Sequence, residues 1–511
     1  MSNRLTELHS ILKKNKYILA AFFVPLLVRS IPEILSWPYP LGLDTLRYIP
    51  IIQNGTAFLS GAAGFFKTHL FYSLATLLYW QVPDAVLLIK IFGPLLLSLL
   101  SVMMYLYAKR VLRWSGLKSF LVALLVGTYF VSLRISWDLY SQTLGLIFLL
   151  AALIALKSFS SPIKYCVASV FMVFTVLSHE LAAVILFFVV GLEAVRFLVK
   201  KLRRDFAYLV VTTGLAGALF LFQRYSSQAA ILVIPIVSSA SEPSLALALH
   251  IGGLLVYCYV LVLPLVALGF VGLKDSFLRY WLVLCVGIPL LTMVFPTMPL
   301  YYWNRWAYLL VYPLLFYAVH GFEKLWMRGS GFKSKVKRLV PKVFAVAYLC
   351  LLLTFSGYYL TTSPENAFSY YSQDNPYLAY IPSSMLQNTV SITDTSSLVT
   401  CIDWLNDNTA ENSVIVAHYA LYDLTFIYIH NLPVVPVRVG SSIWAHLQNE
   451  ATLADGMIEA AKDASVGGST SVYTVWWVSG KGWYGISSLP SEFREVYRVG
   501  SMAVYLYSPR A

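Results

Sequence analysis

Several ionisable side chains lie at the ends of long apolar segments, where a charge is costly and therefore tends to serve a function. Those predicted to share one membrane face are Asp44, Asp138, His179, Glu180, Arg224 and Arg305. Carboxylates and imidazole can hold a hard divalent cation such as Mg²⁺ or Mn²⁺, and arginine binds phosphate through paired hydrogen bonds. The shared face, rather than any single residue, predicts a site.

Each of these residues also has a simpler structural interpretation when it is taken alone. Asp44 and Asp138 precede helical segments and could act as helix N-caps. His179 and Glu180 occupy a tight turn between two apolar segments, where polar residues are expected. Arg305 is flanked by two tryptophans and could be an anchor at the membrane interface.

The composition is that of a membrane protein. The 511 residues are 59% hydrophobic and 12% charged, about half the charged share of a typical soluble domain. The net charge of +13 would fit nucleic acid binding, but excess Lys and Arg in a membrane protein belong to cytoplasmic loops. We therefore expect membrane lipids, and no nucleic acid, as partners.

Apolar stretches that reach or approach the twenty residues needed to cross a bilayer predict about eleven transmembrane helices. They cover residues 17–35, 84–107, 119–134, 142–156, 164–178, 181–198, 206–223, 245–271, 280–298, 304–322 and 340–360. The loops between them alternate between rich and poor in Lys and Arg. This alternation predicts a multi-pass protein of the cell membrane with a cytoplasmic N-terminus and an extracytoplasmic C-terminal domain.

The predicted fold is an α-helical polytopic membrane bundle followed by a small α/β extracytoplasmic domain. The bundle takes residues 1–360, and its long outer loop 36–83 carries a helix expected at the membrane interface or as a re-entrant segment. Residues 361–398 form a linker or cap, and residues 399–511 form the α/β domain.

Hydrophobic periodicity predicts the elements of the C-terminal domain. Helices are expected at 400–408, 421–430 and 443–464, and strands at 413–417, 434–437, 472–478, 495–499 and 502–507.

Four short motifs resemble those of the GT-C glycosyltransferase superfamily, above all its archaeal and bacterial members related to oligosaccharyltransferases and protein mannosyltransferases. They are Gly42-Leu43-Asp44 followed by Tyr48, Trp137-Asp138-Leu139-Tyr140, Ser178-His179-Glu180 and Asn304-Arg305-Trp306. The resemblance implies transfer of a sugar, with inversion, from a polyprenyl (dolichyl) phosphate donor to a lipid, glycan or protein acceptor at the outer face.

The same resemblance implies roles for the site residues. Asp44 would be the general base or a metal ligand. Asp138, His179 and Glu180 would complete a Mg²⁺ or Mn²⁺ site or orient the acceptor. Arg305 and Arg224 would bind the donor phosphate.

The chain also departs from the superfamily in two places. Position 42 is a glycine, whereas many members carry a first acid in that position. Trp476-Trp477-Val478 lacks the aspartate of the oligosaccharyltransferase Trp-Trp-Asp-Tyr-Gly signature, and we interpret it as a buried strand.

Two other functions stay open at this point. A transporter or flippase of lipid-linked or polar solutes would carry charges midway through its spans and two similar halves, and no such repeat is visible. A non-catalytic membrane scaffold whose outer domain binds partners also stays open, because Asp44 stands alone where many superfamily members carry a pair of acids.

Overall fold

The computed structural model describes most of the chain. It covers residues 2–59, 70–158, 162–226, 244–294, 303–328, 335–361, 385, 388, 390–437, 450–465, 470–478 and 488–508. Most of the predicted linker, the first part of the predicted interfacial helix and the start of the last predicted helix lie outside these ranges.

The chain divides into two compact units. The first comprises Met1–Ser30, Gly55–Pro83 and Ile91–Ser356, and the second comprises Ile31–Asn54, Asp84–Lys90 and Gly357–Ala511. The beginning of the predicted outer loop, with Asp44, therefore belongs to the same unit as the C-terminal domain.

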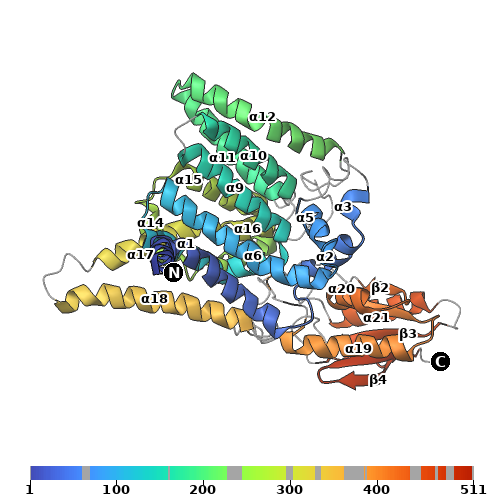
Figure 1. Ribbon diagram of the computed structural model, residues 1–511. Helices are drawn as coiled ribbons and strands as arrows, with labels where there is room; N and C mark the ends of the chain where they lie inside the picture. The colour runs from blue at the N-terminus through green and yellow to red at the C-terminus, as the bar shows by residue number, and fades with distance from the viewer. Residues whose placement is uncertain are drawn as a thin grey trace. The chain divides into compact units, whose positions relative to one another are not determined.

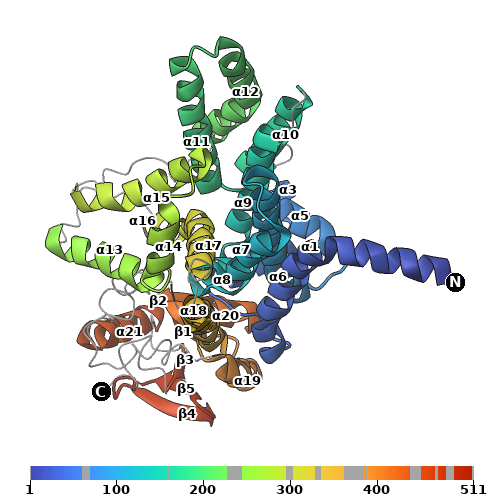
Figure 2. The same ribbon diagram turned by 90° about the vertical axis from the view of Figure 1, so that its left-hand side faces the viewer.

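The first unit is helical (Figure 2). Its helices, three of which extend into the second unit, are α1 (Ser2–Leu35), α3 (Thr56–Leu59), α5 (Leu70–Tyr79), α6 (Ala85–Leu106), α7 (Gly116–Thr128), α8 (Phe130–Asp138), α9 (Tyr140–Ser158), α10 (Ile163–Ser178), α11 (Glu180–Val199), α12 (Arg203–Ser226), α13 (Ser244–Tyr259), α14 (Leu263–Phe270), α15 (Ser276–Val294), α16 (Trp303–Leu309), α17 (Val311–Arg328) and α18 (Lys335–Thr361). A π-helical turn, Tyr107–Val111, continues α6.

Among the described residues, seven helices are long and apolar enough to cross a membrane, and the number rises to as many as nine if each of two bent helix pairs forms one span. The bent pairs are α7 with α8, at 58°, and α13 with α14, at 83°. Every predicted span contains at least one helix. However, α10 is too short to count as a candidate membrane span, and α16 with α17 is not among the candidate spans. The helical bundle is confirmed, whereas the count of eleven spans stays a prediction.

Two glycines allow α14 and α17 to cross in direct backbone contact, and Figure 2 draws these helices side by side. A Cβ atom built on Gly269 would lie 1.9 Å from the carbonyl oxygen of Tyr317, and one on Gly321 would lie 1.8 Å from that of Leu265. Small residues permit such close approaches between membrane helices. The crossing therefore depends on both glycines.

We expect Gly269→Ala and Gly321→Ala each to destabilise the helical unit by about 1–3 kcal/mol, because the added methyl group overpacks the crossing. The measurement is the melting temperature of the purified protein in detergent. Gly287→Ala in α15 is the matched control, since a Cβ there meets no atom within 4 Å. Equal melting temperatures for all three variants would contradict the close crossing.

The second unit contains a five-stranded mixed sheet (Figure 1), and the strand order is β2-β1-β3-β5-β4 (Figure 2). The strands are β1 (Val414–His418), β2 (Val434–Val437), β3 (Val472–Trp477), β4 (Phe493–Val499) and β5 (Met502–Tyr507). β2, β1 and β3 are parallel, and β5 lies antiparallel between β3 and β4. The sheet is accompanied by the helices α2 (Asp44–Gln53), α19 (Thr395–Asn408), α20 (Tyr419–Tyr428) and α21 (Glu450–Ala464).

The sheet forms where the alternation of apolar residues predicted strands. Trp476 and Trp477 are fully buried on β3, in agreement with their interpretation as a buried strand. Pro436 lies on β2 at the edge of the sheet, where the missing backbone donor of proline is tolerated. All five predicted strands are present within two residues of their expected limits.

Candidate functional site

Asp44 is the first residue of α2, and a glycine shapes the turn that leads to it. Gly42 has a φ angle of +97°, which residues other than glycine rarely adopt. Its amide donates a hydrogen bond to Oδ1 of Asn388 at 3.1 Å. The glycine that replaces the expected acid at position 42 therefore has a backbone role.

The Asp44 carboxylate is accessible and sits at a favourable place for a negative charge. Its side chain is 31% exposed, and the N-terminal end of a helix stabilises an anion. On the other side of α2, Leu46, Ile49 and Ile52 are buried and fix the helix in the unit. The packing thus presents Asp44 without burying it.

Arg47, one turn further along α2, links Asp44 to the α/β domain. Its Nη1 lies 3.6 Å from Oδ1 of Asp44. Its Nε donates to Oδ2 of Asp423 at 3.0 Å, and its Nη2 donates to the hydroxyl of Tyr419 at 2.8 Å. Burial alone would lower the pKa of Arg47, but the charge of Asp423 and the contacts of Tyr419 and Asp44 together raise it.

The partners of Arg47 lie on α20, whose first turn is held by His418. Nδ1 of His418 accepts a hydrogen bond from the amide of Ala420 at 3.2 Å, which caps the helix. The ring lies edge-on to Trp476, with 5.7 Å between ring centroids. A buried histidine at the end of β1 therefore fixes the helix that carries Tyr419 and Asp423.

We expect the second unit to lose stability as the pH falls, because burial lowers the pKa of His418 from 6.5 to about 4. Between these values the unfolded chain binds a proton that the folded chain excludes. The stability contributed by neutral His418 is therefore complete above about pH 6.5 and is lost towards pH 4, by about 3 kcal/mol in total. Hydrogen exchange of the amides of β1 and α20, corrected for intrinsic pH effects, measures this loss.

His418→Asn should remove that pH dependence, because asparagine keeps a capping acceptor and does not titrate. The matched control is His430→Asn, which changes an exposed histidine of the same unit. If both variants follow the wild-type pH profile, His418 is not the responsible group.

A buried ion pair anchors the segment that leads to Asp44. Nζ of Lys90 lies 3.3 Å from Oε2 of Glu33, with side-chain exposures of 3% and 8%. The same ammonium donates to Oγ of Ser36 at 2.7 Å and to the carbonyl oxygen of Tyr39 at 2.6 Å. These contacts tie α1 and α6 to the chain between them.

In the first unit, Asp138 is the last residue of α8 and is almost fully buried. Its carboxylate pairs with Arg134, one helical turn earlier. The neighbouring Trp137 lies beneath the guanidinium of Arg29, 4.5 Å from its ring centroid. The Asp138 charge is therefore compensated inside the bundle by a cation of its own helix.

His179 is the single residue between α10 and α11, and Glu180 begins α11. Nδ1 of His179 accepts a hydrogen bond from the amide of Leu181 at 3.1 Å, which leaves Nε2 for other contacts. Nε2 lies 3.8 Å from Oε1 of Glu180, whose side chain is 20% exposed. The turn interpretation is confirmed for their positions, and the two side chains still face each other.

The two candidate phosphate ligands lie on different helices of the first unit, Arg224 on α12 and Arg305 on α16. Arg305 is partly buried in α16 between buried Asn304 and Trp306. Arg224 lies in the last turn of α12, and its side chain is outside the described part. Asp44 belongs to the second unit, and the other five candidates belong to the first.

No protein-family model matches the chain, and no curated protein sequence matches it. Solved structures do. ArnT from Cupriavidus metallidurans in the apo state is 12% identical to this chain, and its TM-score is 0.49. The similarity covers 98% of this chain and 100% of ArnT. The structure of ArnT bound to undecaprenyl phosphate gives a TM-score of 0.48. The Archaeoglobus fulgidus oligosaccharyltransferase in complex with Zn and sulfate is 13% identical, with 96% of this chain and 73% of the enzyme covered and a TM-score of 0.47.

The mycobacterial arabinofuranosyltransferase AftD is also similar, at 13% identity and a TM-score of 0.43 over 97% of this chain and 40% of AftD.

Within the described residues, no group of three or more His, Cys, Asp or Glu side chains could hold a metal ion. His179 and Glu180 offer two donors, and Asp44 has a cation, Arg47, beside its carboxylate. Among the described residues, the predicted ligands therefore do not come together as a group of three or more.

Sequence reasoning missed Tyr419, Asp423, Glu33 and Lys90 as neighbours of the Asp44 segment. Arg47 and Asp423 are 376 residues apart, and no local pattern connects them. Lys90, by contrast, is a charge within an apolar span, and such a residue is a functional signal that could have been followed.

Proposed function

We propose that the chain is a membrane glycosyltransferase that transfers a sugar from a polyprenyl (dolichyl) phosphate-linked donor to a glycan, lipid or protein acceptor. We place the reaction at the outer face of the cell membrane, with the N-terminus cytoplasmic and the C-terminal domain extracytoplasmic. The motifs of the GT-C superfamily support this reaction class. The observation that carries the proposal is Asp44, an accessible carboxylate at the start of α2 that is fixed by its packed helix and by Arg47.

In this reaction Asp44 is the general base. It accepts the proton of the acceptor hydroxyl while the acceptor oxygen attacks the anomeric carbon, and the bond from that carbon to the phosphate oxygen breaks. Attack opposite the leaving group inverts the anomeric carbon. The products are the glycosylated acceptor and the polyprenyl phosphate, whose charge Arg305 and Arg224 would stabilise.

The network around Arg47 supports this role because it restrains Asp44. A base must lie within hydrogen-bonding reach of the proton that it removes. Asp423 and Tyr419 occupy two edges of the guanidinium and leave Nη1 directed to Asp44. The α/β domain thereby takes part in positioning the base.

We propose that Asp138, His179 and Glu180 orient the acceptor. Binding of Mg²⁺ or Mn²⁺ by these residues is an alternative that a chelator tests directly. Because Asp138 is paired with Arg134, acceptor contacts are assigned first to His179 and Glu180.

The test supplies the purified protein with polyprenyl-phosphate sugars and a panel of acceptor alcohols, and measures release of polyprenyl phosphate. Donor cleavage that requires the protein and an acceptor is the expected result. Movement of intact donor across reconstituted vesicles without cleavage would instead identify a transporter or flippase. Absence of both activities across the panel would favour the scaffold interpretation. Parallel reactions with EDTA determine whether a divalent metal is needed.

A further inference from the structure

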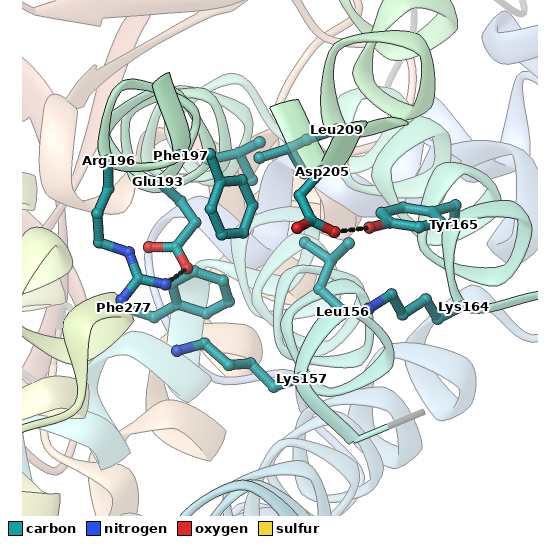
Figure 3. Close-up of a pocket in the computed structure, with 11 residues that line it drawn as sticks. Leu156, Lys157, Lys164, Tyr165, Glu193, Arg196, Phe197, Asp205, Leu209 and Phe277 are labelled. Carbon is teal, nitrogen blue, oxygen red and sulfur yellow. Dashed lines mark hydrogen bonds and ion pairs between the residues drawn. The ribbon is translucent and has the colours of Figure 1, made fainter. Parts of the chain in front are cut away.

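Helix ends of the first unit that carry none of the proposed catalytic residues enclose a charged cavity (Figure 3). The end of α9 meets the start of α10, the end of α11, the start of α12 and the start of α15. The cavity has a volume of about 190 Å³. Its polar lining consists of Lys157, Lys164, Tyr165, Glu193, Arg196 and Asp205.

The polar lining forms two groups, which Figure 3 draws on opposite sides of the cavity. On one side, buried Glu193 forms an ion pair with Arg196. On the other, the Tyr165 hydroxyl donates to Oδ1 of Asp205 at 3.4 Å. Each side of the cavity therefore presents a carboxylate.

The cations of the cavity are not fully used by these contacts. Nζ of Lys157 donates to Oγ of Ser276 at 3.1 Å and lies 3.6 Å from Oδ2 of Asp275. Lys164 forms no ion pair within the described part of the chain, and its ammonium lies 4.9 Å from the Tyr165 ring centroid. Nε of Arg196 is buried without a hydrogen-bond partner there. Unused donors next to carboxylates suit a ligand with both acceptors and donors.

An apolar groove adjoins the charged cavity along the seam between α11 and α12. It has a volume of about 240 Å³ and is lined by Phe187, Val190, Gly191, Ala194, Leu209, Val210 and Thr213. Val190 and Leu209 line both spaces. A Cβ built on Gly191 would meet no atom within 4 Å, so the wall of the groove is open at this glycine.

The surrounding charge favours an anionic membrane component. The turn from α11 to α12 carries Lys200, Lys201, Arg203 and Arg204 against the single acid Asp205. Such a cluster attracts anionic headgroups of the cytoplasmic leaflet, which the Lys and Arg bias predicts for this end of the helices. A polar cavity at the helix ends that continues into an apolar groove has the arrangement of a phospholipid.

We propose that the cavity and the groove together bind one anionic phospholipid whose headgroup carries hydroxyl donors. The phosphate lies between Lys157, Lys164 and Arg196, the hydroxyl groups donate to Glu193 and Asp205, and an acyl chain fills the groove beside Gly191. A polyprenyl monophosphate fits less well, since its headgroup offers no alcohol donors to the two carboxylates. The site is separate from the proposed transfer reaction and does not depend on it.

The test is native mass spectrometry of the full-length protein, delipidated in detergent and titrated with defined lipids. The probes are phosphatidylglycerol, which has phosphate and hydroxyl donors, phosphatidylcholine, which has no donor, and undecaprenyl phosphate. We expect one molecule of phosphatidylglycerol to bind at least about tenfold more tightly than either other lipid. Equal binding of phosphatidylcholine, or tighter binding of undecaprenyl phosphate, would overturn the assignment.

Variants locate the site. Lys164→Gln should weaken phosphatidylglycerol binding about tenfold, and Gly191→Leu should abolish it by filling the groove. The controls are Lys109→Gln, which changes an exposed lysine outside both cavities, and Gly217→Leu, which adds a side chain to α12 where a Cβ meets no atom within 4 Å. If the two site variants bind like the wild type, or if both controls lose the lipid equally, the lipid is held elsewhere.

Discussion

Replacement of Asp44 by asparagine is expected to lower the rate of sugar transfer by about 10²–10⁴-fold, the usual contribution of a general base. Asparagine keeps the shape of the side chain and removes its ability to accept a proton. If Asp44 is the base, the loss falls on kcat, and donor binding changes little because the donor phosphate is assigned to Arg305 and Arg224. The measurement is release of polyprenyl phosphate at saturating donor and acceptor.

The matched control for this variant is Asp403→Asn, which changes an exposed aspartate of α19 in the same unit. It should transfer sugar at the wild-type rate. A second control, Asp423→Asn, weakens the anchor of Arg47 and leaves the base itself, so it should reduce the rate less than Asp44→Asn. Transfer by Asp44→Asn within about threefold of the wild type would exclude Asp44 as the base.

The sequence predicted the elements of this chain well wherever one physical signal dominates. Strands in the α/β domain follow from their apolar, β-favouring runs, and the sheet buries both Trp476 and Trp477. The number of spans is harder to predict because α10 has only 16 residues, although the charges of its flanking loops fit a crossing.

The surroundings of Asp44 could not be predicted from local sequence. The Gly42 turn depends on Asn388, and Arg47 depends on two residues of α20. These contacts join segments more than 340 residues apart, and neither periodicity nor spacing encodes such pairs. The division of the chain into two units also depends on contacts between distant segments, since Ile31–Asn54 packs with the C-terminal residues.

The buried ion pair of Glu33 and Lys90 gives the second large effect. Glu33→Gln is expected to destabilise the second unit by about 3–5 kcal/mol, because it leaves the ammonium of Lys90 charged and buried without its carboxylate. Lys90→Met should cost a similar amount by leaving the charge of Glu33 uncompensated. Hydrogen exchange of residues 31–54 in the full-length protein measures the loss, and sugar transfer should fall with it because this segment carries Asp44.

The double variant Glu33→Gln, Lys90→Met separates the ion pair from other causes. It removes both charges, so it should recover most of the stability that each single variant loses, since a neutral pair carries no uncompensated charge. Lys462→Met, at an exposed position of α21, is the control for replacing a lysine and should leave exchange unchanged. Additive losses in the double variant would show that the two charges act independently, and the anchor for the Asp44 segment would then have to lie in the contacts of Ser36 and Tyr39 with Lys90.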